Sequence, residues 1–250
     1  MPAKSGHIVK SFDEELQHLR DTVVRLGGGA ESQLADAVAA LSKRNSTLAG
    51  TVISNDETLD ALERDIGDSA VRLLALRQPM ANDLREVVSA LKIGSDLERI
   101  GDYAANLAKR AIALNQLPMA RPASAVPRMA SLAQSIIKDT LDAFVRRDAQ
   151  AAIDAWERDE ELDEMYNGLF RELLTYMMED PRNITPCTHL LFIAKNIERI
   201  GDHATNVCET IHYLVTGRQI EGGRPKGDKT SFQVVAPSQG NLDSEGEGKE

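Results

Sequence analysis

The sequence predicts an all-α protein of two tandem, sequence-related three-helix bundles, six helices in all, followed by a disordered C-terminal tail. The phrase Glu-Arg-Ile-Gly-Asp occurs at 98–102 and returns unchanged at 198–202, and such an internal repeat indicates a duplicated unit. Apolar residues recur with a period near 3.6 over most of residues 11–216. Aromatic residues make up only 4% of the chain, so the core must consist of the aliphatic side chains that fill helix bundles.

Composition and charge narrow the possible functions. A hydrophobic content of 42% is sufficient for a buried core, and a formal net charge of −10 argues against a nucleic-acid-binding role. The chain has no apolar leader and no run of 18 apolar residues, so we expect a soluble, cytoplasmic protein without direct membrane insertion. Cys187 and Cys208 would lie about 30 Å apart on one helix and could not pair, which fits a reducing compartment.

The first half, predicted as a domain over 10–117, contains three helices. The first covers 12–41 and carries acidic residues in its first turn, where the helix dipole favours them. Three consecutive glycines at 27–29 cost about 1 kcal/mol each relative to alanine, so they predict a bend, a break or a very close helix contact within one helix. The second helix covers 51–76 and the third covers 82–115. Gln78-Pro79 ends the second because proline cannot continue the ladder, and Asn82 is a good N-cap for the third.

The second half, predicted as a domain over 118–217, repeats this plan. Three prolines mark the boundary between the halves: Pro118, Pro122 and Pro127. The expected helices lie near 128–147, 150–178 and 186–216. Thr185 is the expected N-cap of the last helix, and Gly217 is the residue that closes it.

The remaining residues, 218–250, are rich in Gly, Ser, Lys and Glu and have no periodicity, which predicts a disordered tail. One apolar run interrupts this composition, Phe232–Val235. It is a candidate docking segment, although a patternless tail is more commonly just solvated.

Pairs of carboxylates four residues apart recur at matching places in both halves. Such pairs lie on one helical face, about 5–6 Å apart at Cβ, and repel by roughly 0.2–0.5 kcal/mol. The pairs are Asp56/Asp60, Glu98/Asp102, Asp159/Asp163 and Glu198/Asp202. Arg99 and Arg199 could offset the repulsion locally, and a bound cation would do so more directly. Oxygen ligands select Mg²⁺, Mn²⁺, Ca²⁺ or iron rather than zinc.

If the second and third helices of each bundle run antiparallel, their carboxylate pairs face each other and form one four-carboxylate metal site per bundle. Asn106 and Asn206, one turn beyond the phrase, are candidate hydrogen-bond partners of such a site. The alternative is a solvated acidic face without ligand, in which the phrase serves close helix packing through Gly101 and Gly201. From the residues alone, both interpretations stay open.

The phrases taken together resemble the PhoU family, the regulatory accessory proteins of the phosphate-specific ABC transport system. The resemblance covers residues 10–217. It rests on four stretches of sequence: 56–64, Arg77–Met80 with Asp83–Arg85, Leu97–Ala104, and Glu198–Asn206.

The resemblance implies two similar three-helix bundles whose Glu/Asp-x-x-x-Asp motifs bind iron, Mn or Mg, with zinc also known in the family. The implied ligands are the eight carboxylates named above. It further implies a homodimeric negative regulator of phosphate uptake and of the phosphate-starvation response. This regulator would link the transporter's ATPase subunit (PstB) to the sensor histidine kinase (PhoR). The second half departs from the pattern, since it reads Glu179–Arg182 in place of Arg-Gln-Pro and has Tyr166 where Glu63 is matched.

Two other classes of function compete with this interpretation. A di-iron carboxylate enzyme would need two Glu-x-x-His motifs, and the chain contains Glu15-x-x-His18 and Glu209-x-x-His212, both outside the repeat register. A metal-free helical scaffold is the other. No nucleophile–base grouping and no phosphate-binding loop stands out in the sequence, so we expect no enzyme, no catalytic residues and no organic cofactor.

Overall fold

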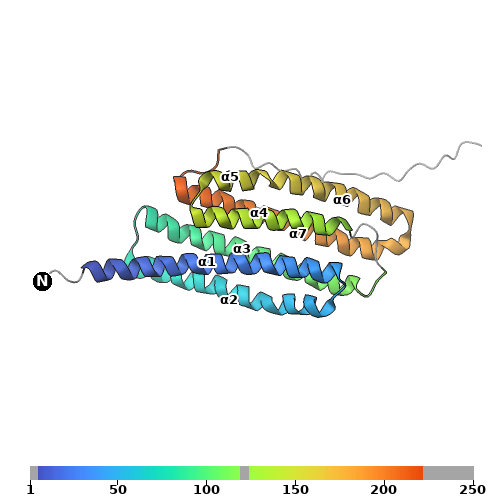
Figure 1. Cartoon of the computed structure of the whole chain (residues 1–250), viewed down its shortest axis with the longest axis horizontal. Coiled ribbons are helices and arrows are strands. Elements are labelled where there is room, and N and C mark those ends of the chain that lie inside the picture. Colours follow the sequence, from blue (N-terminus) through green and yellow to red (C-terminus); the bar gives the residue numbers. More distant parts are fainter. Residues whose placement is uncertain (1–4, 119–123, 222–250) are drawn as a thin grey trace, which may run out of the picture.

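The first half of the chain forms three long antiparallel helices. A computed structural model describes residues 5–118 and 124–221. The three helices are α1 (Ser5–Ser42), α2 (Ser46–Arg77) and α3 (Asn82–Leu114), and each packs against the other two. They form the lower layer in Figure 1.

The second half forms the upper layer. Its helices are α4 (Val126–Arg146), α5 (Ala149–Glu157), α6 (Asp159–Glu179) and α7 (Ile184–Thr216), with a 3₁₀ turn at Pro181–Asn183 before α7. All three preceding helices pack against α7. The predicted all-α architecture of two related bundles is confirmed. None of the helices in the described ranges has the length and apolar character that spanning a bilayer requires.

The helix predicted over 150–178 is divided at Arg158 into α5 and α6, which together take the place of one helix. The backbone N–H of Arg158 bonds to the carbonyl of Ala155, a tighter turn than the α-helical one. Its guanidinium is held by α4, donating to the carboxylate of Asp139 and to Ser135 Oγ at 3.1 Å. These bonds to a neighbouring helix stabilise the interruption. The local sequence has no glycine or proline that would have predicted it.

Helix ends follow the predictions in part. α2 ends at Arg77 beside Gln78, and Gly217 closes α7 with φ 74°, both as expected. The assignment of Thr185 as N-cap is wrong, because the preceding 3₁₀ turn leads directly into α7 and moves its start to Ile184. Asn82 is likewise the first helical residue rather than the cap of α3.

The glycine run leaves α1 unbroken and serves close packing. A Cβ at Gly27 would collide with Leu141 of α4, and one at Gly29 would stand 2.6 Å from Leu59 Cδ2 of α2. Gly28 faces open space. Of the three predicted outcomes, the close helix contact is therefore the one that occurs, and it brings α1 against both bundles.

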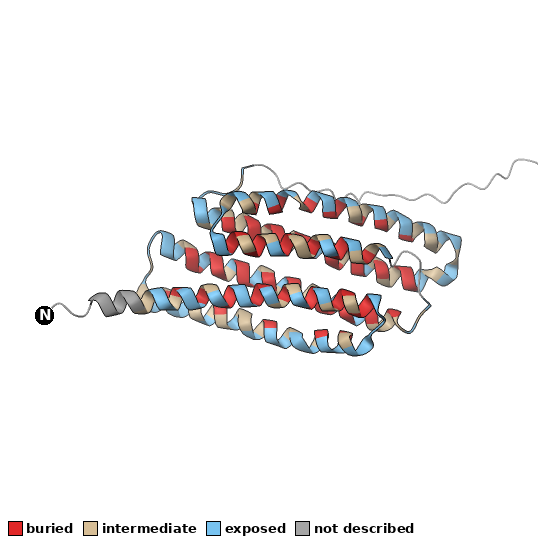
Figure 2. Cartoon of the chain, in the orientation of Figure 1, coloured by how far each residue is buried: buried red, intermediate tan, exposed pale blue. Residues whose placement is uncertain are grey.

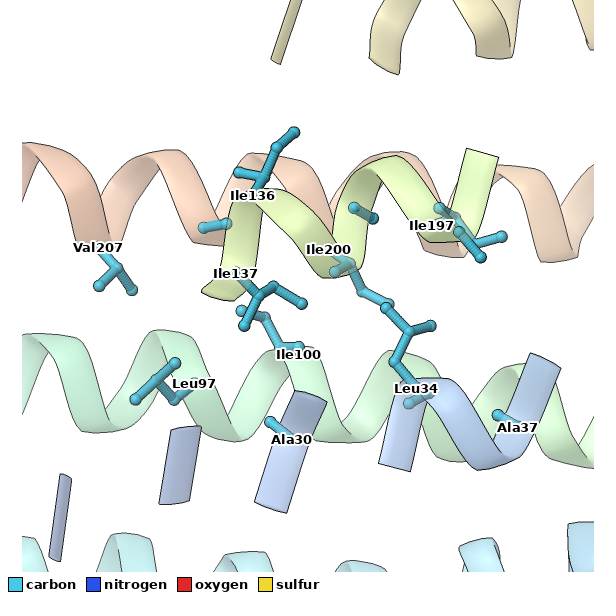
Figure 3. Packing of buried hydrophobic residues seen from close by; sticks show 14 of the residues in the cluster. Ala30, Leu34, Ala37, Leu97, Ile100, Ile136, Ile137, Ile197, Ile200 and Val207 are labelled. Atoms are coloured by element: carbon cyan, nitrogen blue, oxygen red, sulfur yellow. The ribbon is translucent and has the colours of Figure 1, made fainter. Parts of the chain in front are cut away.

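One hydrophobic core runs through both layers. α3 packs against α7 and α1 packs against α4, so the two bundles are joined along two seams. Buried faces point toward these seams in Figure 2. In Figure 3, Ile100 of α3 and Leu34 of α1 face Ile137 of α4 and Ile200 of α7. The repeats thus share a core, and neither bundle's buried surface is complete without the other. The predicted tail lies outside the described residues from 222 onward.

Candidate metal centres

The first carboxylate site lies where α2 crosses the repeated phrase on α3. Gly101 permits this approach, since a Cβ there would stand 2.5 Å from Leu59 Cδ1 of α2. Gln33 of α1 donates from Nε2 to Asp56 Oδ1 at 3.0 Å and to the carbonyl of Gly101 at 3.2 Å. The amide therefore pins the α2 carboxylate against the glycine of the phrase.

Carboxylates from both helices influence one another at this site. Burial raises the pKa of Glu98, and the charges of Asp102 and Asp60 raise it further. Burial also raises the pKa of Asp56, with Asp102 and Asp60 adding to the effect. The site is open to solvent, because the side chains of Asp60, Glu98 and Asp102 are 43%, 23% and 32% exposed. Arg99 supplies a counter-charge, with Nη1 2.9 Å from Asp102 Oδ2.

The second site has the same plan and a different environment. Asp159 and Asp163 lie on α6, Glu198 and Asp202 on α7, and a Cβ at Gly201 would stand 2.6 Å from Asp159 Oδ1. Asp159, Asp163 and Glu198 are only 1%, 3% and 4% exposed.

Lys195 and Tyr166 close the second site. Lys195 Nζ lies 2.7 Å from Glu198 Oε1 and 4.9 Å from the centre of the Tyr166 ring, which is itself buried. The sequence singled out Tyr166 only as a departure from the family pattern, and Lys195 was not identified. A signal existed for Lys195, since it stands three residues before Glu198 on the same helical face.

Burial dominates the electrostatics of the second site. It raises the pKa of Glu198 to about 7, against the opposing hydrogen bond from Lys195. The charges of Asp202 and Asp163 raise it further. The second oxygen, Glu198 Oε2, is buried and has no hydrogen-bond partner in the described part of the chain. A buried carboxylate oxygen in this condition is costly, and a cation is one group that would satisfy it.

The structure thus brings the α2 and α3 carboxylates within electrostatic range, and likewise those of α6 and α7. Within residues 5–118 and 124–221, no group of three or more acidic, His or Cys side chains is already placed to hold an ion. The donor set, carboxylate oxygens alone, fits a hard cation such as Mg²⁺, Mn²⁺ or iron. Side-chain rotation would have to complete the coordination, so metal binding by the eight carboxylates stays a prediction.

Other sequence candidates have separate partners. Asn206 donates to Asp96 Oδ1 at 3.1 Å, on the contact between α3 and α7, rather than to Asp202 as expected. His203 Nδ1 lies 2.7 Å from the same oxygen. These contacts join α3 to α7 beside the two copies of the phrase.

The two Glu-x-x-His motifs do not form a di-iron site in the described chain. Glu15 pairs with Arg77, with Oε1 2.6 Å from Nη2, and Glu209 accepts from Trp156 Nε1 at 3.1 Å. Asp65 Oδ2 lies 3.6 Å from His18 Nε2, but among the residues that the structure describes neither motif is part of a group of three ligands that could hold a metal ion.

The fold and the site together define a class of protein. It is a duplicated three-helix bundle in which carboxylate pairs lie on α2 and α3 of the first unit and, at matching places, on α6 and α7 of the second. Comparison with known families agrees with this class. The model of the PhoU domain matches twice, at residues 23–111 and 126–211, so the chain belongs to the PhoU family.

Relatives match over nearly their whole length. The chain is 55% identical over 226 residues to the phosphate-specific transport system accessory protein PhoU homolog of Caulobacter vibrioides (strain NA1000 / CB15N), covering 90% of this chain and 98% of that protein. It is 54% identical over 227 residues to the homolog of Rhizobium meliloti (strain 1021), covering 90% and 96%.

Solved structures show the same fold. The crystal structure of PhoU from Pseudomonas aeruginosa matches with a TM-score of 0.81 and 42% identity, covering 83% of this chain and 100% of that one. The phosphate transport system regulatory protein PhoU from Streptococcus pneumoniae matches with a TM-score of 0.78 and 33% identity, covering 84% and 99%.

Proposed function

We propose that this chain is an accessory protein of a phosphate-specific transport system that represses phosphate uptake and the phosphate-starvation response. The observation that carries the proposal is the match to accessory proteins of that system over nearly their whole length, in both repeats. Their names describe accessory and regulatory proteins, which supports a regulator rather than an enzyme.

The partners follow from the same role. As an adaptor, the protein would act at the cytoplasmic side and contact the transporter's ATPase subunit (PstB) and the sensor histidine kinase (PhoR), as a homodimer. Co-purification of each partner with the tagged full chain checks these contacts, and sedimentation of the chain alone checks the dimer. If neither partner is retained, the adaptor role is wrong.

A genetic experiment tests the regulatory role. Deletion of the gene should leave phosphate-responsive genes active in high phosphate, and the full chain supplied in trans should restore repression. Repression that persists in the deletion strain would contradict the proposal.

Metal binding at the two carboxylate sites is the second part of the proposal. When bound, a hard cation would neutralise the repelling acids and link α2 to α3 and α6 to α7. The residues that would hold it are Asp56, Asp60, Glu98 and Asp102 in the first site, and Asp159, Asp163, Glu198 and Asp202 in the second.

Metal analysis of protein purified without chelator tests this part. We expect bound iron, manganese or magnesium, reduced by the double change Glu98→Ala and Asp102→Ala. The matched control is Glu160→Ala with Glu164→Ala, an exposed acidic pair of the same spacing on α6. Metal content that is unchanged in the site variant would rule out the first site as a metal site.

A further inference from the structure

A cavity of about 460 Å³ opens where the described chain ends, apart from both carboxylate sites. Its walls come from α3, α5, α7 and the segment after α7. The lining residues are Val88, Lys92, Trp156, Glu209, Thr210, Tyr213, Gln219 and Ile220. Neither the repeat nor the family match explains this cavity, and its volume falls in the range of sites that hold a ligand or an anchoring side chain.

The segment after α7 is already seated beside the cavity. Gly217 turns the chain with φ 74°, and Arg218 N donates to Thr216 Oγ1 at 3.1 Å. The carbonyl of Arg218 lies 3.0 Å from His212 Nδ1. Ile220 then packs half-buried against the hydrophobic core. The chain therefore leaves α7 directed along the cavity wall.

The cavity has a mixed lining, in which polar surface is the larger share. Val88 and Tyr213 are large apolar side chains left exposed on its walls, and the buried Trp156 ring forms another part of its lining. Lys92 and Glu209 provide the polar atoms, and Glu209 accepts from the indole Nε1 of Trp156. The apolar residues of this lining offer contact to one apolar side chain, and its polar atoms offer partners to the backbone of an extended peptide segment.

The chain itself carries one such segment. Beyond Glu221 the sequence is polar and glycine-rich except for Phe232–Val235, which contains the last aromatic residue of the protein. The connection from Glu221 to Phe232 can reach about 36 Å when extended. A connection this short gives its end an effective concentration on the order of millimolar at the cavity, so even a weak contact would be occupied.

We propose that Phe232–Val235 docks into this cavity within the same chain, with the Phe232 ring against Trp156, Tyr213 and Val88. The tail then covers Val88 of α3 and Tyr213 of α7, the exposed large apolar side chains at this cavity. This inference is independent of metal binding and of the regulatory role.

The chain offers a selective experiment, because Trp156 is its only tryptophan. Incorporation of 5-fluorotryptophan gives a single ¹⁹F resonance at the cavity wall. A nitroxide label on Ser231→Cys should broaden that resonance severely, and reduction of the nitroxide should restore it. The native Cys187 and Cys208 are fully buried and will not compete for the label in the folded protein.

A matched label on Ser244→Cys, in the same tail and away from the apolar run, should broaden the resonance far less. Adding Phe232→Ser to the Ser231→Cys chain should remove most of the broadening. The unlabelled Phe232→Ser variant and a chain ending at Glu221 should share one ¹⁹F shift, different from that of the full chain; all described helices remain in both.

Three results would overturn the proposal. One is equal broadening from the labels at 231 and 244. Another is a ¹⁹F chemical shift that is the same in the full chain, in the Phe232→Ser variant and in the chain ending at Glu221. The third is broadening in a mixture of labelled, non-fluorinated chains with fluorinated, unlabelled chains. Only docking to a second copy can produce broadening in that mixture.

Discussion

Glu98 and Glu198 occupy the same position of the repeated phrase and lie in different surroundings. Glu98 borders solvent and is balanced by an exposed arginine from its own helix. Glu198 is buried, is balanced by Lys195, and has a pKa raised by burial to about 7. One sequence thus produces two carboxylates with different proton affinity.

Two neighbouring positions account for the difference. Tyr166 stands where the first half has Glu63, and Lys195 stands where it has Ser95. The tyrosine ring and the lysine stem exclude water from the second site, whereas Glu63 adds negative charge to the first and raises the pKa of Glu98. Both copies of the phrase therefore place their glutamate at the same point of the helix, while the neighbouring side chains determine the pKa of that glutamate.

The largest effect should come from the pH dependence of Glu198 in chelator-treated protein. Because its folded pKa, about 7, lies above its ordinary value of 4.5, folding favours the protonated form. The stability that Glu198 contributes is complete below pH 4.5 and is lost as pH rises through 7, about 3 kcal/mol in total. We expect Glu198→Gln to remove this loss, as urea unfolding at pH 5 and pH 8 would measure.

Glu98→Gln is the matched control for that experiment. Since Glu98 is partly exposed, its variant should change the pH dependence much less. Equal pH dependence in the wild type and Glu198→Gln would show that the second site is hydrated, and the comparison between the sites would fail.

Alanine at the two phrase glycines should give the next largest contrast. A Cβ at Gly201 would meet both Leu162 and a buried carboxylate oxygen of Asp159, while one at Gly101 would meet mainly the flexible end of Leu59. We expect Gly201→Ala to destabilise the protein by about 2 kcal/mol from overpacking. Gly101→Ala should cost about 1 kcal/mol or less, since alanine regains helix propensity. If Gly101→Ala lost more stability than Gly201→Ala, the first site would be the more tightly packed of the two, contrary to these contacts.

Removal of the lysine tests what closes the second site. Lys195→Met keeps the stem and deletes the ammonium group, so Glu198 loses its hydrogen bond at 2.7 Å. Because Glu198 can take up a proton instead, we expect a loss of about 1–2 kcal/mol at pH 8 and less at pH 5. Lys109→Met, at an exposed position on α3, is the control. An equal loss at both pH values would mean that Lys195 acts through packing alone.

Local pattern was sufficient to predict the repeat and the ends of α2 and α7. For Gly27–Gly29 it left three outcomes open, because the contacts with Leu141 and Leu59 come from other helices. The break at Arg158 and the position of Gln33 against Asp56 depend on partners from other helices, which no periodicity reveals. The burial of the second site depends on Tyr166 and Lys195 together. The phrase therefore identified the carboxylate positions, but their environments required the packed structure.

The smallest effect should come from Arg99→Gln. Arg99 contacts Asp102 at 2.9 Å, yet its side chain is 57% exposed, so solvent and salt screen the pair. We expect a change of about 0.5 kcal/mol or less in the free energy of unfolding of metal-free protein, vanishing at high salt. Urea unfolding at low and high ionic strength would measure it. A loss as large as that of Lys195→Met would mean that Arg99 is as essential to its site as the buried lysine, and the two sites would then differ in exposure but not in how their charge is held.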